Sequence, residues 1–133
     1  MRRPATIAAA ILMTVATASA QHDLRDPRDK YVAADAPSPA SNWKDQPWWV
    51  PLAECAAVYR AEPVIKDQFQ KFAGHAMMRI ADDRKIKAEE AAAIVLPWTE
   101  GRGMERAQTM IGYFGIDAVR ANCDALFTQY QAL

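Results

Sequence analysis

Residues 48–59 read Trp-Trp-Val-Pro-Leu-Ala-Glu-Cys-Ala-Ala-Val-Tyr, and they hold the first of the two cysteines in this 133-residue chain. Pro51 suits the first position of a helix, because its missing N–H would have no partner there. The next residues repeat at the spacing of one helical face: Leu52, Cys55, Val58 and Tyr59. Pro63 ends the pattern, since the residue before a proline is pushed out of the α region. We predict a helix over about 51–61, with Cys55 on its apolar face.

Cys123 lies in a second apolar pattern near the C-terminus. Asp117 is a suitable N-cap for a helix there, and its buried stripe would comprise Ile116, Val119, Cys123, Leu126, Phe127 and Tyr130. Packing this helix against the first one would bring the two sulfurs within bonding reach. We predict one intramolecular disulfide, Cys55–Cys123; free buried thiols and an intermolecular link are the alternatives. On the chain-entropy account such a long loop closure is worth about 4 kcal/mol.

The chain between these two segments predicts further helices. From Val64 an apolar stripe runs at helical spacing through Ile65, Phe69, Phe72, Ala76 and Ile80. The charged run 82–87 favours a break, although a single long helix through Leu96 is the alternative. Another helix is expected from about Ala88, and Pro97 should kink or stop it.

Glycines mark the boundaries in the last third of the chain. Residues 99–103 read Thr-Glu-Gly-Arg-Gly and predict a turn. A helical face resumes through Met104, Ala107, Met110, Ile111 and Phe114, with Gly115 as a left-handed cap. No segment alternates with a period of two over a useful length. The predicted fold class is therefore all-α, a four- to five-helix bundle-like domain with one disulfide.

The N-terminus carries the three parts of an export signal. Arg2 and Arg3 are positive, residues 5–18 are apolar or small, and Ala18-Ser-Ala20 fits the rule for signal peptidase. We predict a signal peptide over 1–20, cleaved after Ala20, and a protein of the bacterial periplasm or the medium. An uncleaved anchor is the alternative, but the apolar run is shorter than the roughly 20 residues that span a bilayer.

Residues 21–47 differ in composition from the C-terminal two thirds of the chain. Four prolines interrupt them, and sizeable apolar side chains are few: Leu24, Tyr31, Val32 and Trp43. Little apolar surface is available there to offset the entropy of ordering the chain. We predict a disordered Pro-rich tail over 21–47, or one loosely draped over the domain, and a helical domain over 48–133.

Charge and residue content exclude several kinds of chemistry. Without Arg2 and Arg3 the 16 basic residues become 14 against 16 acidic ones, a net charge of −2 with no basic footprint for nucleic acid. Residues 48–133 contain no serine, and a disulfide would leave no thiol nucleophile. The sequence holds no C-x-x-C-H haem motif, phosphate loop or EF-hand. We predict no catalytic residue, metal or cofactor.

Two chemical alternatives stay open. Glu100 and Glu105 flank the glycine turn and could serve a minimal carboxylate-dependent enzyme, although a solvated turn explains them as well. His75 and Met78 are three residues apart on one helical face, and imidazole with thioether suits copper(I). Methionines at helical spacing are, however, common in hydrophobic cores.

The aromatic cluster of Trp43, Trp48 and Trp49 is the best candidate for a contact surface, with Trp48 and Trp49 as its possible contact residues. Adjacent tryptophans cannot both face inward from one side of a helix, and exposed tryptophan is enriched at binding hot spots. The alternative is that both pack at the start of the first helix. These features favour a non-enzymatic binding module, whose partner would be an envelope protein or a small apolar ligand.

The general plan, with a far-spaced cysteine pair, resembles groups of small exported helical proteins of bacteria that include acid-stress chaperones and immunity proteins of contact-dependent toxin systems. The segment Leu52-Ala-Glu-Cys-Ala-Ala-Val-Tyr59 also resembles small proteobacterial envelope proteins. The resemblance covers export, size, helix content and cysteine spacing. It contains no diagnostic motif and implies no functional residue.

Overall fold

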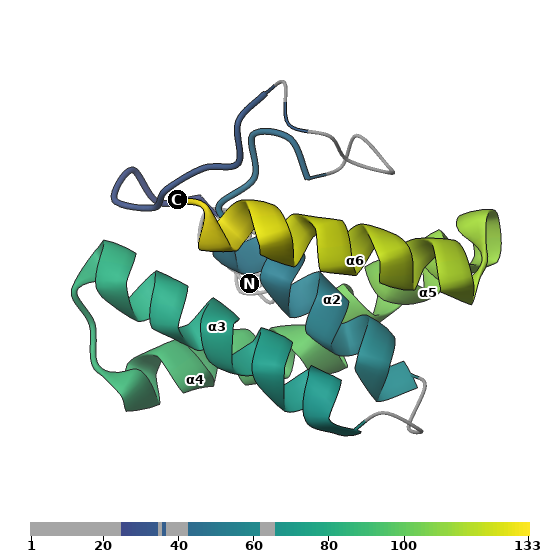
Figure 1. The fold of residues 1–133 in the computed structure, drawn as a ribbon. Coiled ribbons are helices and arrows are strands. Elements are labelled where there is room, and N and C mark those ends of the chain that lie inside the picture. The colour runs from purple at the N-terminus through teal and green to yellow at the C-terminus, as the bar shows by residue number, and fades with distance from the viewer. Residues whose placement is uncertain (1–24, 35, 37–42, 62–65) are drawn as a thin grey trace, which may run out of the picture.

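The computed structural model describes residues 25–34, 36, 43–61 and 66–133. These residues contain five helices: α2 (Trp49–Ala61), α3 (Lys66–Arg84), α4 (Ala88–Glu100), α5 (Arg102–Phe114) and α6 (Ile116–Gln131) (Figure 1). Over the described residues the fold is all-helical and bundle-like, as predicted. The predicted signal peptide over 1–20 lies outside them. None of the helices that are described is long and apolar enough to cross a bilayer.

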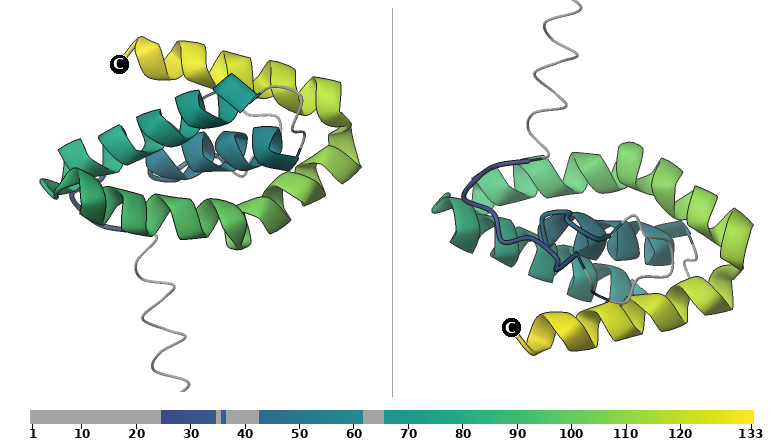
Figure 2. Two further views of the ribbon diagram at one scale, coloured as in Figure 1. Left: turned by 90° about the horizontal axis from the view of Figure 1, so that it is seen from below. Right: turned by 90° about the horizontal axis from the view of Figure 1, so that it is seen from above.

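Helix α2 is the centre of the molecule. Figure 2 shows α3, α4, α5 and α6 arranged around it on all sides. Every residue from Trp49 to Tyr59 is buried. The sequence predicted one apolar face, but a helix enclosed by neighbours is buried all round. Its small side chains, Ala53, Ala56 and Ala57, let the surrounding helices approach closely.

The predicted break after the second long helix is present. Helix α3 ends at Arg84, and Lys85 adopts the left-handed conformation with a φ of 56°. Helix α4 then starts at Ala88. The alternative of a single helix through Leu96 is therefore wrong.

Pro97 does not stop α4, which runs on to Glu100. The residues beyond it keep helical bonding, because the Gly101 N–H donates to the Pro97 carbonyl over 3.0 Å. The Thr99 hydroxyl donates to the Leu96 carbonyl over 2.7 Å. The predicted turn over 99–103 is shorter than expected: only Gly101 separates α4 from α5, which starts at Arg102. Gly115, with a φ of 81°, joins α5 to α6 as the predicted left-handed residue.

The predicted disulfide is confirmed. Cys55 of α2 is bonded to Cys123 of α6, with Cα atoms 5.7 Å apart and a sequence separation of 68. Both side chains are fully buried. The bond therefore ties the central helix to the last helix, and the described part of the chain has no free cysteine.

Residues 25–34 and 43–48, here called the strap, pack against the helices. The Val32 N–H donates to the Gln46 carbonyl and the Trp48 N–H donates to the Lys30 carbonyl, each over 2.8 Å. Val32 and Trp43 are almost completely buried. For these residues the structure differs from a disordered tail and is closer to the alternative of a segment draped over the domain, although it is packed more firmly than that. The reason is that a few apolar side chains reach the core while polar groups bind the helices, which a composition average does not reveal.

Candidate functional site

A charged residue lies in the middle of the buried central helix. Glu54 is 1% exposed, between core residues on both sides in the sequence. Because α2 has no exposed face over this stretch, its carboxylate cannot turn to water. Buried ionisable groups of this kind are costly unless they are paired.

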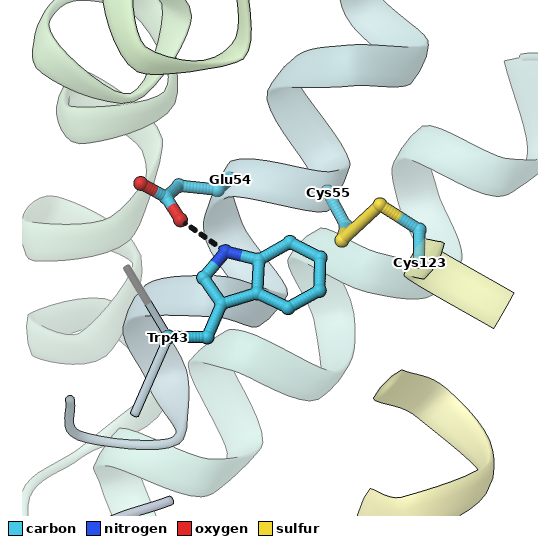
Figure 3. The surroundings of a disulfide bond; sticks show 4 residues. All are labelled: Trp43, Glu54, Cys55 and Cys123. Carbon is cyan, nitrogen blue, oxygen red and sulfur yellow. Dashed lines mark hydrogen bonds between the residues drawn. A yellow bond between two sulfur atoms is a disulfide. The ribbon is translucent and has the colours of Figure 1, made fainter. Parts of the chain in front are cut away.

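Two donors from other parts of the chain satisfy Glu54. The indole Nε1 of Trp43 donates to its Oε2 over 2.6 Å (Figure 3). The guanidinium of Arg106, on α5, forms an ion pair with its Oε1. The cluster Trp43–Glu54–Arg106 therefore joins the strap, α2 and α5 inside the molecule.

Burial raises the pKa of Glu54 from about 4.5 to about 7, although Arg106 and Trp43 both act in the opposite direction. A carboxyl group with this pKa could exchange protons near neutral pH. Both of its oxygens are nevertheless occupied by protein donors, and its side chain is sealed from solvent. In this conformation it has no access to a substrate.

A second polar cluster fixes the start of the strap to the end of α3. Arg84 binds the buried Asp29 carboxylate through two nitrogens, at 3.0 and 3.1 Å. The Lys30 N–H donates to Asp83 over 2.8 Å. Hydrogen bonds from Arg28 hold the pKa of Asp26 below its usual range. This arrangement positions the strap, and its carboxylates are engaged by neighbouring donors of the chain.

Trp48 and Trp49 are both buried and offer no exposed contact surface. Trp48 is 4% exposed, and its ring centroid lies 5.7 Å from that of Tyr130. Trp49 is 1% exposed and packs edge-on against Trp98, with ring centroids 5.7 Å apart. The alternative, in which both pack at the start of the first helix, agrees with this arrangement. The strap and four surrounding helices provide cover on both sides of α2, so the two side chains need not share one face.

Glu100 and Glu105 do not converge on a pocket. Both are exposed, and Glu100 forms a surface ion pair with Arg60 at 3.0 Å. Glu105 lies in the first turn of α5, where a negative charge interacts favourably with the helix dipole. Their positions are those of solvated side chains around a tight turn.

His75 and the methionines lie in different surroundings. His75 is half-buried and packs edge-on against Phe127 at 4.9 Å. Met78 is 58% exposed, whereas Met77, Met104 and Met110 pack in or against the core. Within the described ranges no three His, Cys, Asp or Glu side chains are grouped to hold a metal ion.

The most exposed aromatic residues of the described ranges lie at the corner between α5 and α6. Tyr113 is 81% exposed and Phe114 47% exposed, and their ring centroids are 6.3 Å apart. We call this pair the aromatic corner. Gly115 turns the chain directly after it, at the corner where α5 meets α6 (Figure 1).

Comparison of the chain with protein-family models, with curated proteins and with solved structures finds no match. The functional assignment therefore rests on the residues of this chain alone.

The sequence patterns predicted neither the Trp43–Glu54–Arg106 cluster nor the ion pair of Asp29 with Arg84. A single Glu within the otherwise apolar run 48–59 was a signal for a buried charge that needs a partner. Its partners, Trp43 and Arg106, are 11 residues before and 52 residues after it, so no local pattern could name them. Of the aromatic corner, Phe114 was assigned to the helical face with Met110 and Ile111, and Tyr113 was not singled out.

Proposed function

We propose that this chain is a small exported helical protein, stapled by its disulfide, that acts by binding another envelope protein and not by catalysis. The observation that carries the proposal is the aromatic corner. Tyrosine and phenylalanine rings are large and lose little conformational entropy when a partner covers them, which is why such residues recur at hot spots of interfaces.

The position of the corner favours a protein partner over a small apolar ligand. Tyr113 and Phe114 are 81% and 47% exposed at the corner between α5 and α6, whereas ligand sites are usually concave. Two neighbouring exposed rings suit burial in a pocket on a partner.

The polar side chains support a role without catalysis. The carboxyl group of Glu54, whose pKa is strongly raised, is buried and bound by Trp43 and Arg106. Glu100 and Glu105, the carboxylates considered from the sequence, are solvated. A binding role therefore needs fewer additional assumptions than a carboxylate-dependent reaction.

The proposed compartment is the periplasm or the medium, reached by cleavage of the signal peptide after Ala20. A disulfide between buried cysteines is compatible with an oxidising compartment. The intact mass of the protein recovered from the periplasm tests this point. We expect a chain that starts at Gln21 and is two hydrogens lighter than its reduced form; recovery of the complete chain with reduced cysteines would contradict it.

Site-specific photo-crosslinking tests the binding role. A photo-reactive phenylalanine analogue at position 113 should give a discrete adduct with one envelope protein in intact cells. The same analogue at the exposed, polar position Gln131 provides the matched control. Equal adducts from both positions, or none from position 113, would contradict the proposal.

The identified partner then permits a quantitative test. We expect the double variant Tyr113→Ser/Phe114→Ser to weaken binding by at least about 30-fold, the effect of losing roughly 2 kcal/mol at a hot spot. The variant's unfolding midpoint should change only modestly, because Tyr113 is largely exposed and Phe114 is about half exposed. Undiminished affinity would place the interface elsewhere.

A further inference from the structure

The Cys55–Cys123 bond is closed on one side by helices. On the face of α2 that carries Cys55, Tyr59 stacks on Phe72 of α3, with ring centroids 5.6 Å apart. Phe72 in turn packs edge-on against Phe127 of α6, with 5.5 Å between centroids. These rings connect α2, α3 and α6, so a reagent cannot reach the sulfurs from the side of α3 without separating helices of the core.

The other side of the bond is covered by the strap. Glu54, which precedes Cys55, directs its carboxylate toward the strap, where the Trp43 indole N–H donates to it over 2.6 Å. Figure 3 shows the six-membered ring of Trp43 pointing toward the sulfur of Cys55. Trp43 is 1% exposed, and both cysteines are 0% exposed. An irregular segment, and not a helix, therefore completes the cover of the disulfide on this side.

Hydrogen bonds hold this part of the strap in place. The Val32 N–H donates to the Gln46 carbonyl over 2.8 Å, and the Arg25 guanidinium donates to the Asp45 carbonyl over 2.6 Å. The first half of the strap is bound in turn to the end of α3 by the buried ion pair described above. The two halves thus hold each other, and exposing the sulfurs on the side of Trp43 requires the strap to leave the helices.

We propose that the strap is a shield for the disulfide, with Trp43 as the side chain that keeps thiol reagents away from Cys55–Cys123. Thiol–disulfide exchange needs direct approach of a thiolate to a sulfur atom, so its rate depends on access. Undocking of the strap breaks fewer contacts than global unfolding, and it is therefore the main route by which the sulfurs are reached. The shield concerns the fold alone and stands independently of the binding partner proposed above.

Formation and loss of the bond need the same open state. In formation, the thiolate of one cysteine attacks a sulfur of a disulfide-bearing oxidant and releases one thiolate of that oxidant. The second cysteine then attacks this mixed disulfide and releases the other thiolate. The chain loses two protons and two electrons, and the oxidant leaves as a dithiol; reduction by a dithiol is the reverse. An oxidoreductase of this class therefore has to act before the strap docks, and the docked strap then protects its product.

Reduction of the folded chain by dithiothreitol tests the shield. The free thiols are alkylated and counted by intact mass, at several urea concentrations below the unfolding transition. Undocking of the strap exposes only part of the surface that unfolding exposes, so reduction by this route should depend weakly on urea, whereas reduction through global unfolding rises steeply. We expect the weak dependence for the unmodified chain. A steep dependence that continues down to zero urea would overturn the shield.

A pair of variants then identifies the cover. Trp43→Ala removes the ring over the bond, and Ile80→Ala is the matched truncation of a fully buried side chain on α3. Trp43→Ala should be reduced at least about ten-fold faster than the unmodified chain, still with a weak dependence on urea. Ile80→Ala should gain only in the steep, unfolding-linked route. No gain in Trp43→Ala, or the same gain in both variants by the steep route, would overturn the shield.

Should Trp43→Ala not fold, a second pair of variants at the surface decides. Arg25→Ala removes a hydrogen bond to the second half of the strap, and Arg60→Ala removes one from another exposed arginine, away from the strap. Arg25→Ala should raise the reduction rate without urea by about three- to ten-fold, the effect of one hydrogen bond. Arg60→Ala should leave that rate unchanged. An unchanged rate in Arg25→Ala, or an equal rise in both, contradicts the proposal.

Discussion

Single residues carry the unusual chemistry of this protein, and Glu54 carries most of it. Ionised and buried, it loses the hydration that a surface carboxylate keeps, and the ion pair with Arg106 recovers only part of that loss. The pKa of Glu54 is raised because the loss of hydration outweighs the attraction of its partners. Removing one partner of a buried pair costs more than replacing the whole pair, so Glu54 and its two donors are best considered as a unit.

The raised pKa makes the stability of the whole chain depend on pH. In the unfolded chain the pKa of Glu54 returns to about 4.5, whereas in the folded chain it is about 7. The folded state therefore holds this proton more tightly. The stabilisation is complete below about pH 4.5 and is lost as the pH rises through about 7.

We expect the free energy of unfolding in urea to be about 2–3 kcal/mol larger at pH 5 than at pH 8 as far as Glu54 alone contributes. The difference between the unmodified chain and Glu54→Gln isolates this contribution, since other titrating groups are common to both. Parallel pH curves for the two proteins would contradict the expectation.

At the level of helices, the approach of α5 to α4 depends on one glycine. Gly103 is buried in the first turn of α5. A Cβ at this position would lie 2.6 Å from ring atoms of Trp98 and 2.8 Å from the Trp98 carbonyl oxygen. The backbone oxygen cannot yield as a side chain can, and Trp98 is itself held against Trp49. A methyl group here would push the two helices apart.

We therefore expect Gly103→Ala to lower the free energy of unfolding by about 1–3 kcal/mol, the usual cost of overpacking. Gly112→Ala, in the same helix, is the matched control, because a Cβ there meets nothing within 4 Å. That variant should be neutral or more stable by up to about 1 kcal/mol, from the better helix propensity of alanine. Urea denaturation compares the two; equal effects would show that the contact with Trp98 is unimportant.

The helices also show where local patterns suffice. The charged run 82–87 correctly predicted a break, and Gly115 correctly predicted a left-handed residue, because both depend on neighbours in sequence. Of the two outcomes expected at Pro97, a kink or a stop, the stop is wrong for α4. A proline removes one helical bond, but it does not stop a helix whose later residues are held by packing: Thr99 is fully buried and Trp98 contacts Trp49.

At the level of the whole molecule, four helices enclose α2, and the disulfide fixes the last of them to it (Figure 2). The bond closes a loop of 68 residues, so on the chain-entropy account it restricts the unfolded chain strongly. A chain of this size buries a modest core, and such a restriction forms a large share of its net stability.

We expect the double variant Cys55→Ala/Cys123→Ala to lose about 2–5 kcal/mol of unfolding free energy. The unmodified chain, reduced by dithiothreitol before denaturation, should lose a similar amount and so controls for the volume lost with the sulfurs. A loss below about 1 kcal/mol in both cases, well under the usual range for a native disulfide, would mean that helix packing alone determines the stability.

Local patterns in the sequence were enough to define the all-helical class, the order of the helices and the pairing of Cys55 with Cys123, since periodicity and residue chemistry can be recognised without knowledge of neighbours in space. The complete burial of α2, the enclosure of Glu54 by Trp43 and Arg106, and the ordered strap became visible only once the chain was folded. A helix pattern reports which face is apolar, but how many neighbours surround that helix depends on contacts between residues far apart in the chain.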